Sequence, residues 1–352
     1  MEELISVIMP VYNASKWLDK SIGCLIEQTY PRWELVAVDD GSTDESLAIL
    51  DYWSQKDSRI RVFSHKNGGA AKTRAYGLKY VTGDYTFYYD ADDTISDNML
   101  DTCLNAISNT EADIAMPNLI QQTPDGLLIN DNFKTWNIEP GTIINGQEAF
   151  ERSIEWHGAW ATALYRTELF KKIACDENYL GYFNSAELIT RIVLLNSTSV
   201  VYCDAEYYYN IHSESMSRKI SVRYFEYLNT DIRLIQEAKK LQQPRYIVAK
   251  TEVFAFREMI ELWHHYLDNR TLFSNEDRKN IFDKFDSFHK CFPRENVDEM
   301  LSSRPGITPK LQHLLLLHGW SLCRMSLTLA RKLGKHNKLY PWFSEEQIKS
   351  LK

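Results

Sequence analysis

The first 120 residues alternate short apolar runs with helical patterns, and this alternation limits the possible folds more than any other feature. Runs rich in β-branched or aromatic residues lie at 5–9, 34–38, 60–63, 85–89 and 113–116, and helical patterns separate these runs. A repeated strand–helix order places the strands in a mostly parallel sheet with helices on both faces. Ligands bind at the carboxyl ends of the strands in such sheets. We therefore expect an α/β fold whose functional residues follow the strands.

The rest of the chain changes character at about residue 220. Between 121 and 220 the pattern is less regular, with a helical stretch at 186–195 and a strand-like run at 202–209. Beyond 221, long helical patterns dominate. We therefore expect a first domain of residues 1–220, with halves 1–120 and 121–220, and a helical C-terminal domain of residues 221–352.

The composition argues against several classes of protein. A formal net charge of −8 makes the chain a poor general binder of phosphate backbones, so we expect no nucleic-acid partner. The six cysteines are scattered with no C-x-x-C pair, which favours free thiols in a reducing compartment. No run approaches the ~20 apolar residues of a membrane span, and the first residues lack a signal-peptide pattern. We therefore expect a cytoplasmic protein.

Three carboxylates follow the apolar run at 85–89. They belong to Asp90, Asp92 and Asp93, with only Ala91 among them. Clustered like charges are costly unless something neutralises them. Mg²⁺ and Mn²⁺ favour oxygen ligands and often keep substrate phosphates among those ligands. The pattern predicts a divalent metal site, and a solvated turn with an acidic helix cap is the alternative.

Two further patterns indicate a bound nucleotide. Asp39 and Asp40 end the second apolar run, where a carboxylate can accept a hydrogen bond from a nucleobase N–H. The turn at 67–69 contains two glycines and leads into a helical pattern with Lys72 and Arg74, which suits a diphosphate. The alternatives are a helix N-cap for the aspartates and a structural ion pair for Arg74.

A series of motifs lies in unbroken order along residues 4–120. They are Ser6-Val7-Ile8-Met9-Pro10-Val11-Tyr12-Asn13, Gln28-Thr29-Tyr30, Asp39-Asp40-Gly41-Ser42-Thr43-Asp44, Asn67-Gly68-Gly69, Arg74 with Gly77, Gly83-Asp84-Tyr85, and Asp90-Ala91-Asp92-Asp93. Together they resemble the motifs of glycosyltransferase family 2, the inverting, metal-dependent group with the GT-A fold. Ala75 departs from the Arg-Asn pair that the family often has. The resemblance implies a GT-A catalytic domain over residues 1–220, with a nucleotide-sugar half and an acceptor half.

The resemblance also implies roles for individual residues. Asp92 would be the main ligand of Mn²⁺ or Mg²⁺, with His212 completing the metal or diphosphate site, although a lone histidine is also often structural. Asp93 would lie close to the donor sugar or the acceptor and act in catalysis. The donor nucleotide would be bound by Pro10, Val11, Tyr12, Asn13, Asp39, Asp40, Lys72, Arg74, Asp90 and Ala91.

The general base of the family usually heads a helix, often within a Glu-Asp pair. Glu187 is the matching residue, and Arg191 follows one turn later, where an i,i+4 pair can orient it. Ala186 leaves only one carboxylate at this place. A surface Glu–Arg pair is the alternative. Trp156 and Trp160 could form a sugar platform for the acceptor, with core packing as the alternative.

We therefore predict inverting sugar transfer from a nucleotide-sugar, with UDP favoured, to a saccharide or lipid-linked saccharide in surface polysaccharide synthesis. A catalytically weak or inactive glycan-binding subunit is the first alternative, because of Ala186. A sugar nucleotidyltransferase is less favoured, because residues 10–14 do not form a basic, glycine-rich phosphate loop. The segment 311–338 combines leucines with cations, so it predicts either peripheral contact with the inner face of the plasma membrane or packing against neighbouring helices.

Overall fold

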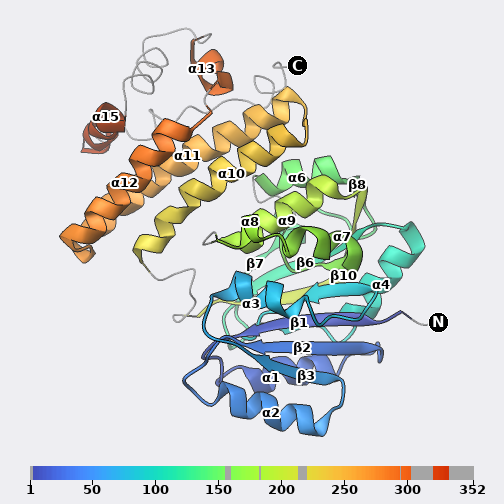
Figure 1. Cartoon of the computed structure of the whole chain (residues 1–352). Coiled ribbons are helices and arrows are strands. Elements are labelled where there is room, and N and C mark those ends of the chain that lie inside the picture. Colours follow the sequence, from blue (N-terminus) through green and yellow to red (C-terminus); the bar gives the residue numbers. More distant parts are fainter. Residues whose placement is uncertain are drawn as a thin grey trace. The chain divides into compact units, whose positions relative to one another are not determined.

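The computed structural model describes residues 3–154, 160–181, 184–212, 220–293, 295–302 and 320–332. The chain divides into two compact units. The first consists of residues 1–181 and 185–218, and the second of residues 182–184 and 219–352. Figure 1 shows a mixed sheet with helices in the first unit and helices alone in the second. The two units are described separately below.

The first unit is built on one sheet with the strand order β3-β2-β1-β4-β9-β6-β10-β5. Every residue of β1 and β2 is buried, as expected for parallel strands covered on both faces. The predicted α/β fold with a mostly parallel central sheet is therefore confirmed. The parallel strands at its centre are β1 (Ile5–Val11), β2 (Trp33–Asp39), β3 (Ile60–Ser64), β4 (Tyr85–Tyr88), β6 (Ile114–Gln122) and β10 (Ser199–Asn210).

Helices cover both faces of the sheet. Alternate residues of β1, such as Val7, join a core with α1 and α4, while Ile8 points to the opposite face. There α3 lies so close that a Cβ on Gly77 would be 3.1 Å from the Ile8 side chain, so a larger residue would require Ile8 to shift by a few tenths of an ångström. These helices are α1 (Leu18–Ile26), α2 (Ser46–Lys56), α3 (Ala70–Gly77) and α4 (Met99–Thr110).

The second half of the first unit contains short elements that the sequence patterns did not indicate. β9 lies antiparallel between β4 and β6, and β5 pairs with β10. Strands of two to four residues are too short to show a periodic pattern. The elements that were not indicated are β5 (Thr94–Ile95), β7 (Leu128–Asp131), α5 (Asn132–Trp136), β8 (Ile143–Asn145), α6 (Gly146–Ile154), β9 (Leu164–Arg166), α7 (Thr167–Ala174) and α8 (Glu177–Leu180). By contrast, α9 (Ser185–Asn196) corresponds to the helical stretch predicted at 186–195.

The strand directions determine where a site can form. β6 runs parallel to β4, because β9 is antiparallel to both, and β10 runs parallel to β6. The six parallel strands therefore end at one edge of the sheet, called the carboxyl edge below. Helix α9 leads directly into β10 and contacts α6 and α7, so its N-terminal turn lies toward this same edge.

The second unit is helical, and its core is rich in aromatic residues. Phe225, Trp263 and Phe285 are buried together within it. In the described part of the chain, no helix is both long and apolar enough to cross a membrane. The elements are η2 (Val222–Glu226), α10 (Tyr227–Lys240), α11 (Arg245–Asn269), η3 (Arg270–Leu272), α12 (Asn275–Cys291), α13 (Glu295–Ser302) and α15 (Trp320–Lys332).

Of the segment 311–338, the structure describes residues 320–332, which form α15. Leu327 of this helix is buried, and Arg331 donates a hydrogen bond to the backbone oxygen of His264 at 3.0 Å. Met325 and Leu329 are exposed. The described part of α15 therefore packs on α11 through one side, while its other side faces solvent.

Candidate functional site at the carboxyl edge of the sheet

The acidic motif forms the turn between β4 and β5 at the carboxyl edge. The side chains of Asp90 and Asp92 are 34% and 35% exposed, so both can meet a ligand. Arg74 of α3 lies 2.5 Å from Asp90, from its Nη2 to the Oδ1 atom. Burial alone would lower the pKa of Arg74, but Asp90 outweighs this effect and raises it. The ion pair that stood as the alternative interpretation of Arg74 is present, and it brings a cation to the acidic turn.

Asp92 lies next to His212, which follows the end of β10. The Nε2 atom of His212 is 2.9 Å from Oδ2 of Asp92. The His212 ring also stacks on Trp17, with ring centroids 4.8 Å apart. Burial and the neighbouring Asp90 raise the pKa of Asp92, against the opposing effect of His212. The structure thus brings the two predicted metal ligands together and adds Trp17, a contact that no sequence motif indicated.

Asp93, one residue further, faces the interior. Asp93 is 1% exposed, and both of its carboxylate oxygens accept hydrogen bonds. One accepts from the Tyr207 hydroxyl at 2.7 Å and the other from the Asn210 N–H at 2.8 Å. Burial, followed by the charges of Asp92 and Asp90, raises the pKa of Asp93 well above its usual range. Asp93 therefore lies beneath the acidic turn, where it is enclosed by protein groups.

The aspartates that end β2 are also engaged within the protein. Asp39 accepts hydrogen bonds from the N–H groups of Gly41 and Ser42, both at 3.2 Å. The two oxygens of Asp40 accept from the N–H groups of Gly68 and Gly69, at 2.7 and 2.9 Å. Both aspartates thus organise the loops at the carboxyl edge. Each oxygen of Asp40 keeps a further lone pair, so a nucleobase N–H can still be accepted.

The end of β1 reaches the same edge. Pro10 and Val11 are the last residues of this buried strand, and Tyr12 beyond them is 48% exposed. Asn13 adopts a left-handed φ of 49°, and its side chain accepts a hydrogen bond from the Thr43 N–H at 2.8 Å. The strand end therefore presents the Tyr12 ring on a loop that Asn13 holds in place.

The remaining predicted donor residues differ in exposure. Lys72 is exposed on α3, in the turn that follows Gly69. Ala91 is 5% exposed, between the two accessible aspartates of the acidic turn. Lys72 can therefore reach a ligand with its side chain, whereas Ala91 contributes mainly the backbone of the turn.

The predicted base lies in the first turn of α9. Glu187 is 25% exposed and its Oε2 atom lies 3.9 Å from Nη1 of Arg191, whose side chain is 3% exposed. Nη2 of Arg191 donates to the backbone oxygen of Ser153 at 3.2 Å. The cation is thus fixed in the interior, while the carboxylate it attracts remains accessible. A surface pair would leave both groups in solvent, so the buried arginine argues against that alternative.

Of the two tryptophans predicted to form a sugar platform, the structure describes Trp160. Trp156 lies outside the described residues. Trp160 is 6% exposed and packs near Phe133, with ring centroids 6.3 Å apart. Because its ring is buried, Trp160 offers no free face to a sugar, and core packing describes its role.

Comparisons with known proteins agree with this geometry. The family model described as Glycosyl transferase family 2 matches residues 6–174. The glycosyltransferase GlyG of Streptococcus pneumoniae serotype 4 is 31% identical over 228 residues, which cover 62% of this chain and 74% of that protein. This chain belongs to glycosyltransferase family 2.

Two further similarities concern the wider family and the fold. The minor teichoic acid biosynthesis protein GgaB of Bacillus subtilis is 30% identical over 220 residues, which cover 60% of this chain and 23% of that protein. The crystal structure of S. aureus TarS 1-349 in complex with UDP-GlcNAc superposes with a TM-score of 0.65 at 19% identity, covering 99% of this chain and 92% of that one. At this identity the likeness shows the fold alone.

The candidate site of this family 2 glycosyltransferase offers two side-chain donors that suit a divalent metal. Among the residues that the structure describes, no group of three His, Cys, Asp or Glu side chains is arranged to hold a metal ion. Asp92 and His212, however, place an oxygen and a nitrogen donor side by side. Mg²⁺ and Mn²⁺ sites commonly use few protein ligands and complete their shell with substrate phosphates and water. The residues present therefore fit a metal that binds together with the donor diphosphate.

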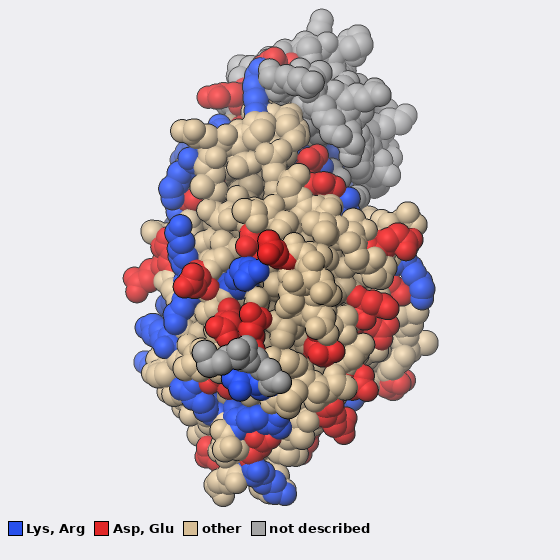
Figure 2. Space-filling view, turned by 90° about the vertical axis from the view of Figure 1, so that its right-hand side faces the viewer, with Lys and Arg blue, Asp and Glu red and all other residues tan. Residues whose placement is uncertain are grey.

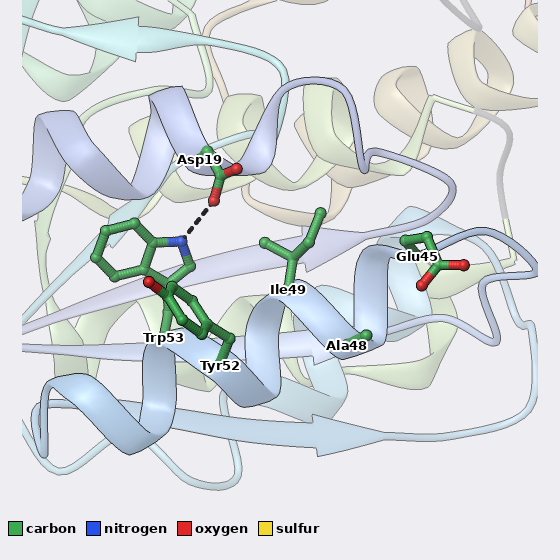
Figure 3. A pocket seen from close by; sticks show the side chains of 6 residues that line it. All are labelled: Asp19, Glu45, Ala48, Ile49, Tyr52 and Trp53. Atoms are coloured by element: carbon green, nitrogen blue, oxygen red, sulfur yellow. Dashed lines mark hydrogen bonds between the residues drawn. The ribbon is translucent and has the colours of Figure 1, made fainter.

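A shallow depression elsewhere on the glycosyltransferase lies between α1 and α2. Figure 3 shows the Trp53 ring beside Asp19, whose carboxylate accepts a hydrogen bond from the indole N–H at 2.8 Å. None of the predicted site residues lines it. Its lining consists of Asp19, Glu45, Ala48, Ile49, Tyr52 and Trp53. The face in Figure 2 carries interspersed acidic and basic side chains.

Proposed function

We propose that this glycosyltransferase transfers a sugar from a nucleotide-sugar to an acceptor hydroxyl with inversion at the anomeric carbon, in a metal-dependent reaction. The observation that carries the proposal is the pairing of Asp92 with His212 at the edge toward which the accessible Glu187 also lies. A UDP-sugar is the favoured donor, because the TarS structure of the same fold is a complex with UDP-GlcNAc. The product would be a surface polysaccharide, in keeping with the teichoic acid biosynthesis protein among the relatives.

The residues of the carboxyl edge would bind the donor. Tyr12 would contact the base, Asp40 would accept a hydrogen bond from it, and Lys72 would approach the phosphates. Asp92 and His212 would hold Mn²⁺ or Mg²⁺, which as a Lewis acid stabilises charge on the departing diphosphate. A leaving group stabilised in this way needs no general acid from the protein.

The acceptor is activated by Glu187. Its carboxylate would remove the proton from the acceptor hydroxyl as a general base. The acceptor oxygen then attacks the anomeric carbon from the face opposite the diphosphate, which inverts the configuration. Arg191 would keep Glu187 in place, because its guanidinium is buried and bonded to the Ser153 backbone.

The variant Glu187→Gln tests the base. We expect it to bind the UDP-sugar with unchanged affinity and to lose ~10²–10⁴-fold in turnover, the usual contribution of general base catalysis. Glu177→Gln is the matched control, because Glu177 also lies in the first turn of a helix and is exposed. Calorimetric titration of the donor and a transfer assay measure the two quantities. Full turnover in Glu187→Gln would exclude this residue as the base.

The same measurements address the second candidate function. Ala186 stands where the family often has another acid, and this favours a weak or inactive subunit that binds the donor without using it. Wild-type protein that binds a UDP-sugar with Mn²⁺, yet neither transfers nor hydrolyses it, would establish that alternative.

A lipid-linked acceptor would require contact with a membrane, and the segment 311–338 remains the predicted place. In its described part, Arg331 bonds to the backbone of α11, whereas Met325 and Leu329 are exposed. Flotation of the whole chain with anionic vesicles tests the contact. A chain that stays in the soluble fraction at low salt would leave packing as the role of this segment.

A further inference from the structure

We propose that Asp93 and Tyr207 are positioning residues that fasten the acidic turn to the end of β10 and so set Asp92 beside His212. This inference rests on the proposed metal-dependent function. It changes the role expected for Asp93, from a group that acts on the substrate to a group that orients a metal ligand. It also gives a role to Tyr207, for which the sequence predicted none.

The first observation is the enclosure of the Asp93 carboxylate. It is buried, with one oxygen bonded to the Tyr207 hydroxyl and the other to the Asn210 N–H, at 2.7 and 2.8 Å. A carboxylate in this position cannot touch a sugar at the surface without breaking both bonds. Buried carboxylates are costly unless hydrogen-bonded, so the two donors also hold Asp93 where it is.

The second observation is that Tyr207 bonds to both ends of the acidic turn. Its hydroxyl accepts a hydrogen bond from the Asp90 N–H at 3.2 Å and donates one to Asp93. The ring is fully buried and lies edge-on to Tyr89, with centroids 6.1 Å apart. A rigid phenol thus fixes the backbone at Asp90 and the side chain three residues later.

The third observation is that Asn210 joins the same turn two residues before His212. Besides bonding to Asp93, Asn210 donates from its side-chain amide to the backbone oxygen of Asp92 at 2.9 Å. The amide oxygen in turn accepts a hydrogen bond from Gln122 at 3.1 Å. Hydrogen bonds from Asn210 therefore connect the backbone at Asp92 to the end of β10, two residues before His212.

The consequence concerns metal affinity. A metal site is sensitive to displacements of about 0.5 Å in its ligands, and loss of an orienting partner typically costs ~10–100-fold in affinity. Removing the Tyr207 hydroxyl frees the Asp90 N–H and one oxygen of Asp93, while the ring that fills the core remains. We expect Asp92 to lose its fixed relation to His212 without general unfolding.

The test uses Tyr207→Phe with Tyr208→Phe as its matched control. Both changes remove one hydroxyl from adjacent residues of β10, but the Tyr208 hydroxyl donates its hydrogen bond to Glu206 and not to the acidic turn. Mn²⁺ binding in the presence of UDP is followed by the loss of the free Mn²⁺ signal in electron paramagnetic resonance. We expect ~10–100-fold weaker Mn²⁺ binding for Tyr207→Phe and wild-type binding for Tyr208→Phe.

A second variant separates positioning from catalysis. In Asp93→Asn the amide keeps the shape of the carboxylate and can still accept the Asn210 N–H. Positioning predicts weaker Mn²⁺ binding, with kcat restored at saturating Mn²⁺. A kcat that stays more than ~100-fold low at saturating Mn²⁺, together with an unaffected Tyr207→Phe variant, would overturn the proposal and make Asp93 catalytic.

Two different results would distinguish a wrong positioning role for Asp93 and Tyr207 from a wrong metal-dependent function. Wild-type protein that binds UDP without any Mn²⁺ dependence would refute the metal-dependent function and this inference together. Wild-type protein with normal Mn²⁺ dependence and an unchanged Tyr207→Phe variant would refute the positioning role alone. The Tm of each variant should lie within a few degrees of the wild-type Tm. A change in Mn²⁺ binding is then due to the site and not to unfolding.

Discussion

Glu34→Gln should destabilise the first unit without affecting its chemistry. Glu34 lies near the start of β2, at the amino edge of the sheet and therefore away from the site. Its Oε1 atom accepts three hydrogen bonds, from the Ser6 hydroxyl at 2.7 Å, the Thr82 N–H at 2.7 Å and the Thr82 hydroxyl at 2.8 Å. Its Oε2 atom accepts from Arg61 at 2.6 Å. One carboxylate thus connects β1, β2, β3 and the loop before β4.

The size of the effect follows from these four contacts. Glutamine keeps Oε1, but three bonds to a charged acceptor become bonds to a neutral one, which costs about 0.5–1 kcal/mol each. The new amide N–H₂ faces the Arg61 guanidinium, and because Arg61 is 36% exposed, its ion pair adds only about 0.5 kcal/mol. The loss is therefore about 2–3.5 kcal/mol, or about 4–14 °C in Tm for a unit of this size.

The pH dependence has a definite sign. Burial alone would raise the pKa of Glu34, but the hydrogen bonds from Ser6, Thr82 and Arg61 outweigh burial and lower it. A carboxyl group whose pKa is lower in the folded state stabilises fully above its unfolded pKa of about 4.3 and loses this contribution as the pH falls through the folded value. The stability gap between wild type and Glu34→Gln should be constant from pH 7 to about 5 and narrow below about 4.

Urea unfolding followed by circular dichroism, repeated across this pH range, measures the gap. Glu45→Gln is the matched control, because Glu45 is exposed and should change the free energy of unfolding by less than about 0.5 kcal/mol. Transfer activity per folded molecule should be the same in both variants. A loss below about 0.5 kcal/mol in Glu34→Gln, or a gap that does not vary with pH, would refute the reasoning.

Two other predictions concern the metal and the backbone. Asp92→Asn should remove the Mn²⁺ dependence of UDP binding in calorimetric titrations while leaving Tm nearly unchanged, and a variant that keeps this dependence would exclude Asp92 as the metal ligand. Gly23→Ala should stabilise α1 by about 0.5–1 kcal/mol, because its Cβ meets nothing within 4 Å. Gly83→Ala should destabilise by more than about 2 kcal/mol, because its Cβ would lie 2.5 Å from the Leu4 backbone oxygen, and thermal unfolding of the two variants should shift in opposite directions.

The positions of the central parallel strands along the chain could be predicted, because they are short apolar runs. β1 and β2 are buried throughout, and their sequence of β-branched residues is typical of strands covered on both faces. β9 could not be predicted in the same way. It has three residues and occupies its place through pairing with β4 and β6, which are distant in sequence. Local patterns contain no information about such a partner, so the antiparallel insertion became visible only in the structure.

The location of the site could also be predicted, because motifs that follow parallel strands meet at one edge. The sequence placed Asp92, His212 and Arg74 in one site, and the structure brings them together there. The contribution of Trp17 could not be foreseen. Its ring stacks on His212, a residue almost 200 positions away, and nothing in its local sequence distinguishes it from an ordinary apolar residue of a helix.

The functions of the individual carboxylates were the least predictable part, because contacts from distant segments decide which of them face a ligand. Asp93 is enclosed by Tyr207, which lies 114 positions away. Asp92 has the same side chain as Asp93 and is adjacent to it, yet it points outward to His212. A motif therefore fixes where the carboxylates gather but not what each one does. Replacing either aspartate by asparagine is the same chemical change, yet excess Mn²⁺ should restore turnover only in Asp93→Asn, since Asp92→Asn removes the metal ligand itself.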